Sequence, residues 1–384
     1  MGGRKTINNA FNFCTMNIPF LSFDATNEAF REEAMATFGR FLDSKWYVLG
    51  EMTKQFESDY AVFNSVTHAV GISNGLDALQ IALRVLNIGP GDEVIVPSNT
   101  YIATALAVSY VGAKPVFVEP DIDTYNIDSV KIMAAITSRT KAIMPVHLYG
   151  QACAMDEIMA IAKKYNLMVV EDNAQAHGAT FNGILTGSFG HVNATSFYPS
   201  KNLGALGEAG AITTNDDKLA YKTRVMRNYG SQQRYYNEIK GFNARIDELQ
   251  AGLLSVKLKH LEQWTAERRR IASWYMEELS DCAELILPKI AAGATHVYHL
   301  FVIRTTKRDA LQQHLQAAGI GTVIHYPIPP HLQQAYSDLG HKKGDFPIAE
   351  EIAETILSLP LFIGMNRAQV AYVAQNIKTY FSQS

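Results

Sequence analysis

The chain has 384 residues, and about 150 residues per domain gives an expectation of two to three domains. Hydrophobic residues make up 47% and charged residues 18%, which excludes a disordered chain and predicts a large buried core. With 34 Lys and Arg against 37 Asp and Glu, the net charge is −3. No broad basic surface for nucleic acid is therefore expected.

Three cysteines, Cys14, Cys153 and Cys282, lie far apart and fit neither a disulfide framework nor a CxxC metal site. We therefore expect no metal and a cytoplasmic, reducing location. No apolar run approaches the roughly 20 residues that span a bilayer, and the N-terminus lacks the apolar region of a signal peptide. Residues 1–15 are expected to be a disordered extension, with the folded chain beginning at Met16.

Strand-like and helical segments alternate along the first two thirds of the chain. The expected strands and helices are Glu93–Val96, Ile102–Val111, Lys114–Val118, Lys141–Val146, Met155–Tyr165 and Leu167–Val170. This alternation predicts an α/β fold with a mostly parallel sheet flanked by helices. Function in such sheets lies at the carboxyl ends of the strands, which directs attention to the polar segments that follow them.

The pattern changes in the last third of the chain. The expected elements there are a long helix from Asp247 to about Leu279, strands His296–Arg304 and Thr322–His325, and helices Arg308–Ala317, Ala349–Ser358 and Arg367–Phe381. We therefore expect a large domain over residues 16–260 and a smaller C-terminal α+β domain over residues 261–384.

A small polar turn at Ser73-Asn-Gly-Leu connects a strand to a helix. Backbone N–H groups at such a turn, together with the helix dipole, favour an anion, and Gly75 permits close approach of a phosphate. The alternative is an ordinary helix start with Ser73 or Asn74 as the N-cap.

Glu171-Asp-Asn-Ala-Gln175 follows the apolar run Leu167–Val170. A carboxylate at a buried strand end is costly without a cationic partner, and a protonated pyridine nitrogen would pair with Asp172. Gln175 would reach the other edge of the same ring. The alternative is that Asp172 caps a following helix.

Lys201 lies between a strand-like approach and a loop that contains Gly204, Gly207 and Gly210. Burial would lower the pKa of its amine and make it a nucleophile able to form a Schiff base. Ser196 would donate to a phosphate. The alternative is a surface lysine in a flexible loop.

Together these three segments meet the needs of pyridoxal 5′-phosphate: a phosphate site, an acid for the ring nitrogen and a lysine for the aldehyde. Tyr101, at another strand end, would stack on the ring face, unless it is a core aromatic.

The sequence at this point resembles the fold-type-I aminotransferases, specifically the DegT/StrS group of nucleotide-sugar aminotransferases, from Met16 onward. The resemblance is carried by the segments Trp46–Gly50, Ser73–Leu79, Pro145–Gly150, Glu171–Gly178, Ser196–Leu203, Gly241–Gln250 and His325–His331. It implies a smaller C-terminal domain and an obligate homodimer with the active site at the interface.

The resemblance also implies the role of each residue. Lys201 would bind the cofactor (PLP, alternating with PMP) and carry the proton of the 1,3-shift. The expected cofactor contacts are Asp172 at the ring nitrogen, Gln175 at the ring hydroxyl, Tyr101 on the ring face, Gly75, Leu76 and Ser196 at the phosphate, and Asn243 from the partner subunit.

The substrate expected from the resemblance is a nucleotide-linked, dTDP-type 3-keto-6-deoxyhexose with L-glutamate as amino donor. The product would be a 3-amino-3,6-dideoxy sugar nucleotide for a lipopolysaccharide or an antibiotic. Tyr198, His325 and Tyr326 would line the sugar pocket, although His325 and Tyr326 also suit a turn before Pro327. The nucleotide diphosphate would be met by Arg234, Lys240 or Arg245, each of which also suits a solvated surface.

Other functions stay open at this point. One is amination at C4 of a keto-sugar, and another is a fold-type-I enzyme acting on amino acids, with Arg304 or Arg308 as its carboxylate ligand. From a different class, a non-catalytic PLP or sugar-nucleotide sensor would also use these segments.

Overall fold

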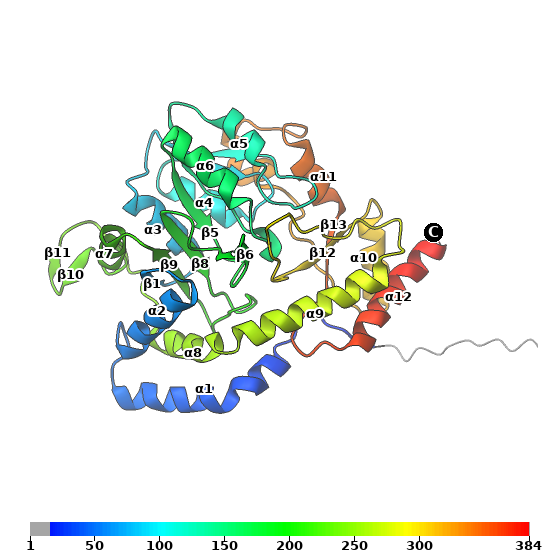
Figure 1. Ribbon diagram of the computed structural model, residues 1–384, viewed down its shortest axis with the longest axis horizontal. Helices are drawn as coiled ribbons and strands as arrows, with labels where there is room; N and C mark the ends of the chain where they lie inside the picture. The colour runs from blue at the N-terminus through cyan, green and yellow to red at the C-terminus, as the bar shows by residue number, and fades with distance from the viewer. Residues whose placement is uncertain (1–15, 384) are drawn as a thin grey trace, which may run out of the picture.

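The computed structural model of the protein describes residues 16–383 (Figure 1). The expectation of a disordered extension over residues 1–15 lies outside these described residues. None of the helices in the described part of the chain is long and apolar enough to cross a membrane.

A seven-stranded sheet forms the centre of the molecule, in the order β1-β9-β8-β5-β4-β2-β3. All neighbouring strands pair in parallel except β9, which is antiparallel to both β1 and β8. This architecture confirms the α/β expectation. The strands are β1 (His68–Ile72), β2 (Glu93–Pro97), β3 (Lys114–Val118), β4 (Thr140–Ile143), β5 (Met168–Asp172), β8 (Val192–Ser196) and β9 (Gly210–Thr214).

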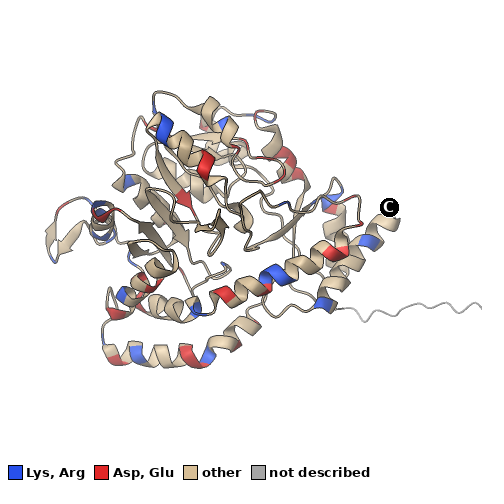
Figure 2. Cartoon of the chain, viewed as in Figure 1, with Lys and Arg blue, Asp and Glu red and all other residues tan. Residues whose placement is uncertain are grey.

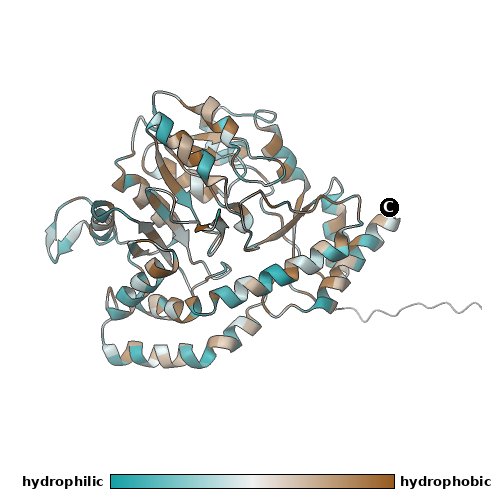
Figure 3. Ribbon diagram, in the orientation of Figure 1, coloured by the Kyte–Doolittle hydropathy of each residue, from teal (hydrophilic) through white to brown (hydrophobic). Residues whose placement is uncertain are grey.

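Helices cover both faces of this sheet because successive strand residues point to opposite faces. Val94, Val96 and Val170 pack with α3 and α4, whereas Ile95 and Val169 pack on the other face with α6. Figure 3 shows the resulting brown strands surrounded by helices that alternate teal and brown. These helices are α2 (Glu51–Phe63), α3 (Gly75–Val85), α4 (Ile102–Tyr110), α5 (Ser129–Ala135), α6 (Met155–Tyr165) and α7 (Asp217–Met226).

The C-terminal part has a second core, where Tyr275, Phe301 and Ile377 are buried. Ile18 also packs in this core and pairs with Ile320, so the first described residues lie with the C-terminal part rather than with the large domain. The elements of this part are α9 (Leu261–Leu279), β12 (Phe301–Arg304), α10 (Arg308–Ala317), α11 (Pro347–Thr355), β13 (Ile356–Leu359) and α12 (Arg367–Gln383).

Four expected elements of the last third differ from the structure. The long helix breaks at Lys259–His260 into α8 (Glu248–Leu258) and α9. The expected helix Ala349–Ser358 ends at Thr355, because the buried residues Ile356–Leu359 pair as β13 with β12. Thr322–His325 makes only an isolated bridge between Val323 and Ser358.

The fourth difference concerns residues 296–300, which do not extend β12. Their backbone instead lies along the loop after β4, where Val297 N donates to Gly150 O at 2.8 Å and Leu300 N donates to Tyr149 O at 3.2 Å. This pairing joins the C-terminal part directly to the edge of the sheet where the polar segments lie.

Two peripheral features project from the central body in Figure 1. One is helix α1 (Asp24–Ser44), which packs on α8, and the other is the hairpin of β10 (Ser231–Gln233) and β11 (Tyr236–Asn237). A second small hairpin is formed by β6 (Thr180–Phe181) and β7 (Ile184–Leu185). Lys and Arg mix with Asp and Glu on the outer helices without a large region of one sign (Figure 2).

Candidate active site

The turn between β1 and α3 forms a cradle of backbone amides. Asn74 is the N-cap of α3, and its Oδ1 accepts from the amide of Asp77 at 2.8 Å. The helix start expected as the alternative is therefore present, with Asn74 as its N-cap. The amides of Gly75 and Leu76 lie in the first turn of α3, where no helical carbonyl accepts from them, so they stay available to an anion. The cap and an anion site are thus compatible at this turn.

Ser196, at the end of β8, lies directly against this turn. A Cβ added to Gly75 would stand 2.5 Å from the Cβ of Ser196 and 3.0 Å from its Oγ. A Cβ on Gly210 would likewise stand 2.5 Å from the carbonyl of Asn74. Glycine at both positions lets the turn and the strand end approach closely, which brings the Ser196 hydroxyl to the start of α3.

Asp172 ends β5 and is only 5% exposed. Its Oδ2 accepts from Thr104 Oγ1 at 2.9 Å and its Oδ1 accepts from the amide of Ala174 at 3.2 Å. Burial raises the pKa of the Asp172 carboxyl, while these two hydrogen bonds and the charge of Lys201 act in the opposite direction. Asp172 caps no helix, because the residues after β5 form turns. Its carboxylate is therefore free to face Lys201 and a ligand beside it.

Lys201 lies in a compact loop after β8 and not in a loose surface segment. Its amide donates to the carbonyl of Tyr198 at 2.8 Å, and the amide of Ala205 donates to the carbonyl of Phe197 at 2.7 Å. Burial lowers the pKa of the Lys201 amine to about 8, although Asp172 opposes the shift. A substantial fraction of the amine is therefore neutral near pH 8, as a nucleophile requires.

Histidines surround Lys201 and are held neutral. Burial and the charge of Lys201 lower the pKa of His177 to about 3 and that of His325 to about 4. Burial lowers the pKa of His299 well below its usual value, and Lys201 and Arg268 add to the effect. Asp172 is thus the group in this neighbourhood whose charge favours the ammonium form of Lys201.

Gln175 joins the sheet edge to the C-terminal part. Its Oε1 accepts from the amide of Tyr149 at 2.7 Å, and its Nε2 donates to the hydroxyl of Tyr326 at 3.0 Å. The rings of Tyr326 and Tyr101 are tilted with centroids 5.2 Å apart. His325 Nδ1 lies 2.8 Å from Ser358 Oγ. The structure therefore brings Gln175, Tyr101 and the expected sugar-pocket residues His325 and Tyr326 into one neighbourhood.

Three expected site residues lie on the surface of this chain. Tyr101 is 53% exposed, Tyr198 is 51% exposed, and Asn243 is also exposed. Asn243 belongs to a segment that runs beside the cradle, since the amide of Ser73 donates to the carbonyl of Ala244 at 3.1 Å. A surface position next to the cradle is where a residue could contact a second molecule.

Thr104, Tyr149, His299 and Arg268 belong to the site but were not expected from the sequence. The sequence could have predicted Thr104, because it falls one helical turn after Tyr101 in the helix that follows a strand end. Tyr149 could have been predicted less clearly, from its position after the strand-like run Lys141–Val146. No local pattern predicts His299 or Arg268, since each is placed by packing between segments far apart in the chain.

Replacing Thr104 with valine is expected to slow turnover about tenfold, because a hydrogen bond to a buried carboxylate is lost. Thr104 lowers the pKa of Asp172, so its removal raises that pKa and moves the acid limb of the activity profile to higher pH. The measurement is the rate, as a function of pH, at which the expected amino donor passes its amine to the cofactor. Thr104→Ser, which keeps the hydroxyl, should restore the wild-type profile, and an unchanged profile in Thr104→Val would contradict this role.

Arg304 and Arg308, the expected carboxylate ligands of an enzyme acting on amino acids, are engaged elsewhere. Arg304 forms an ion pair with Glu351, and its Nη1 donates to the carbonyl of Ile122 at 3.2 Å. Arg308 pairs with Asp309 and donates to the carbonyl of Ala353 at 3.0 Å. Arg308 therefore holds the C-terminal part together, whereas Arg304 also joins that part to the large domain at Ile122.

The family model described as the DegT/DnrJ/EryC1/StrS aminotransferase family matches residues 28–378. The chain is 51% identical over 363 residues to the dTDP-3-amino-3,6-dideoxy-alpha-D-galactopyranose transaminase of Aneurinibacillus thermoaerophilus. That alignment covers 94% of this chain and 99% of the relative.

Two solved structures are similar over nearly the whole chain. S. venezuelae DesV, in complex with a ketimine intermediate, has a TM-score of 0.93 and 46% identity, and the match covers 95% of this chain and 99% of that one. Bacillus subtilis NtdA with bound cofactor PMP has a TM-score of 0.89 and 31% identity, over 97% of this chain and 87% of that one.

Proposed function

The chain belongs to the DegT/DnrJ/EryC1/StrS aminotransferase family, and we propose that it transfers the amino group of L-glutamate to C3 of a dTDP-linked 3-keto-6-deoxyhexose. That the chain is a PLP-dependent sugar-nucleotide aminotransferase follows from the family and from its relatives. The nucleotide, the carbon position and the donor are the proposal, and the name of the relative at 51% identity supports the first two. The observation that carries the aminotransferase activity is a half-buried lysine with a lowered pKa beside a buried carboxylate and an amide cradle.

These residues fit pyridoxal phosphate in three ways. The cradle of Gly75, Leu76 and Ser196 suits a phosphate, since glycine leaves the amides accessible there. The buried carboxylate of Asp172 suits a protonated ring nitrogen. The amine of Lys201 suits the aldehyde. When bound, the cofactor supplies an electron sink for the carbanion that forms at the donor's α-carbon.

The protein's own groups then position and move protons. Lys201 would take the proton from the α-carbon of the donor as a general base and pass it on to the cofactor as a general acid, which completes the 1,3-shift; a pKa near 8 is suitable for both roles. Asp172, fixed by Thr104 and Ala174, keeps its charge at the ring nitrogen. None of the three neighbouring histidines is a cation beside Lys201, because His177, His299 and His325 are neutral.

We place the sugar between Tyr101, Tyr326 and His325. Tyr326 and Gln175 are hydrogen-bonded, so the hydroxyl of Tyr326 has a fixed position. Tyr101 is 53% exposed, which leaves its ring accessible at the mouth of the site. An aromatic ring with a fixed polar tip suits a deoxyhexose, which has both an apolar methyl group and hydroxyls.

A second copy of the chain completes the site in this proposal. Large apolar side chains are exposed on α1 and the segment after it, where Met35 is 63%, Trp46 63% and Tyr47 52% exposed. An exposed apolar patch of this kind indicates a protein interface. The projecting hairpin adds Tyr235, 82% exposed, with Arg234 over its ring at 4.9 Å. We therefore assign the partner to another copy, with the exposed Arg234 and Lys240 available for the diphosphate. Arg245 donates to Asn228 Oδ1 at 3.0 Å and lies 5.2 Å from the ring centroid of Tyr229, so it would have to exchange these contacts for the diphosphate.

Asn243→Asp is expected to weaken cofactor binding about tenfold, because a carboxylate near the phosphate adds like-charge repulsion. The measurement is titration of the unloaded protein with PLP by absorbance. Gln233→Glu, which adds the same charge at the exposed end of strand β10, serves as the control and should leave the affinity unchanged.

Mixed dimers test whether Asn243 acts across the interface. A dimer of one Lys201→Ala chain and one Asn243→Asp chain has one intact site if Asn243 serves the partner, and none if it serves its own chain. At a PLP concentration near the wild-type dissociation constant, recovery of about half the wild-type activity is therefore expected. Half-saturation by PLP at the weakened level of the Asn243→Asp homodimer, in mixed dimers verified by mass, would reject the role across the interface.

The function is tested with a small panel of 3-keto and 4-keto nucleotide sugars, each with L-glutamate and purified protein. Mass spectrometry and NMR of the product should show an amine at C3 of the dTDP-linked 6-deoxyhexose. An amine at C4, or turnover only between amino acids, would replace the proposed substrate.

We also propose a cytoplasmic location, supported by the free thiols of Cys153 and Cys282.

A further inference from the structure

Residues 324–328 carry two residues of the expected sugar pocket, His325 and Tyr326. Among the described residues, no hydrogen bond between backbone groups involves this segment. Side chains hold its backbone instead: the hydroxyl of Tyr149 donates to the carbonyl of His325 at 2.5 Å, and another side chain donates to the carbonyl of Ile328 at 3.1 Å. The place of Tyr326 therefore depends on contacts from outside the segment.

Tyr149, in the loop after β4, is 1% exposed and uses all three of its polar groups. Its amide donates to Gln175 Oε1 at 2.7 Å, its carbonyl accepts from the amide of Leu300 at 3.2 Å, and its hydroxyl holds His325. Its φ of 58° lies in the left-handed region, which a residue with a Cβ adopts only where its surroundings hold it there. Tyr149 is thus a fixed junction between the sheet edge and the C-terminal part.

Tyr326 is held at both ends by this junction. Gln175 Nε2 donates to its hydroxyl at 3.0 Å, while Tyr149 holds the carbonyl of His325, the residue before it. Because Gln175 and Tyr149 are also bonded to each other, the three contacts form a closed ring. Burial raises the pKa of the Tyr326 hydroxyl, so this hydroxyl keeps a proton to donate while it accepts from Gln175.

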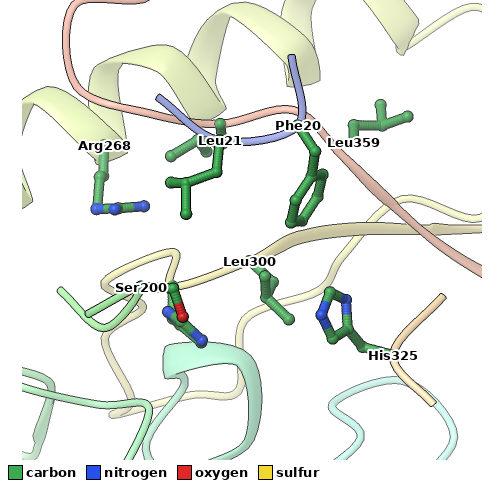
Figure 4. Close-up of a pocket in the computed structure, with 9 residues that line it drawn as sticks. Phe20, Leu21, Ser200, Arg268, Leu300, His325 and Leu359 are labelled. Atoms are coloured by element: carbon green, nitrogen blue, oxygen red, sulfur yellow. The ribbon is translucent and has the colours of Figure 1, made fainter. Parts of the chain in front are cut away.

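The side chain of His325 is not part of this ring of contacts. It borders a cavity of about 50 Å³ together with Phe20 and Leu300 (Figure 4), and its ring centroid lies 5.7 Å from that of Phe20. The contact with Tyr149 therefore fixes the backbone before Tyr326 and not the imidazole of His325.

We propose that Tyr149 is a positioning residue that sets Tyr326 against the sugar nucleotide. The inference rests on the proposed function and concerns only the step in which the amine passes between the cofactor and the sugar. The rings of Tyr326 and Tyr101, with centroids 5.2 Å apart, offer an aromatic surface with a polar tip, which suits a sugar ring. L-glutamate has no ring to place there, so the step that takes the amine from the donor should not need the Tyr149 hydroxyl.

The experiment follows the absorbance of the cofactor in wild-type, Tyr149→Phe, Tyr326→Phe and doubly substituted holoenzyme, with either L-glutamate or the amino-sugar nucleotide added. Phenylalanine keeps the ring and the backbone contacts of Tyr149, so the fold should persist, which a thermal melt checks. Tyr149→Phe is expected to raise the half-saturating concentration of the amino-sugar nucleotide about tenfold, because the carbonyl of His325 loses its donor. The half-saturating concentration of L-glutamate should stay within about threefold of wild type, because the donor does not meet Tyr326.

The double variant tests whether Tyr149 acts through Tyr326. If it does, the loss in the double variant is much smaller than the product of the two single losses, since the exact place of Tyr326 matters less once its hydroxyl is gone. Losses that multiply would show that the two residues act independently and would overturn the proposal.

Tyr275→Phe is the matched control. Tyr275 is fully buried in the second core and its hydroxyl donates to the carbonyl of Pro360 at 2.9 Å, so the change removes the same kind of bond away from the site. Neither step should change in this variant. If Tyr149→Phe slows both steps equally, or leaves half-saturation by the amino-sugar nucleotide unchanged, the proposal is wrong. A wild-type enzyme that reacts with L-glutamate but not with the amino-sugar nucleotide would refute the proposed substrate, and this inference with it.

Discussion

Replacing Lys201 with alanine is expected to lower transamination by about 10⁴-fold or more, since the variant loses both the nucleophile and the proton carrier. The loop around Lys201 is held by backbone bonds from Phe197, Ala205 and Lys201 itself, none of which needs the side chain. Lys201→Ala should therefore fold normally and still bind PMP. The measurements are turnover of the sugar nucleotide, a thermal melt and titration with PMP.

The lowered pKa of Lys201 also predicts how the uptake of PLP by unloaded protein depends on pH. Because that pKa is about 8 and not 10.5, the neutral amine increases as pH rises through about 8. Uptake of PLP by unloaded wild-type protein should accelerate over the same range, and Lys201→Ala should show no such phase. Borohydride treatment of the loaded enzyme should label Lys201 in peptide mapping. Label on another lysine, or retained turnover in Lys201→Ala, would contradict the assignment.

The candidate site was largely readable from sequence because its residues follow strand ends. Asp172 ends β5 and Ser196 ends β8, and parallel strands bring their carboxyl ends to one edge of a sheet. The alternation of apolar runs is therefore sufficient to predict that these polar segments lie at one edge of the sheet. Gly75 was readable for a related reason, since a glycine opens the helix after β1.

The residues that sequence did not reveal depend on contacts between distant segments. Arg268 sits in a run of three arginines that suits a solvated face, and only the fold buries the first of them. Ile356–Leu359 extends a helical pattern, but pairing with β12 makes it a strand. The break at Lys259–His260 has neither proline nor glycine to mark it. In the first two cases tertiary packing overrides a local pattern.

Asp172→Asn is the second change with a large expected effect, a loss of about 10²- to 10³-fold in turnover. Removing one partner of a buried charge pair costs about 3–5 kcal/mol, and Asp172 would supply the charge opposite the ring nitrogen. Asparagine has nearly the same shape, so the fold and the hydrogen bond from Thr104 can be retained. The readouts are the rate of each half-reaction and the absorbance maximum of the bound cofactor.

Asp172→Asn also changes the pKa of Lys201, and the direction of that change shows whether slower turnover comes from the ring nitrogen or from Lys201. The Asp172 carboxylate stabilises the ammonium form of Lys201, so a neutral asparagine lowers the lysine pKa below about 8. Unloaded Asp172→Asn should therefore take up PLP at lower pH than wild type, even though its turnover is slower. If slower turnover came only from a less reactive Lys201 amine, uptake of PLP would slow as well. Faster uptake combined with slower turnover assigns the loss to the ring nitrogen, and unchanged turnover argues against Asp172 as its partner.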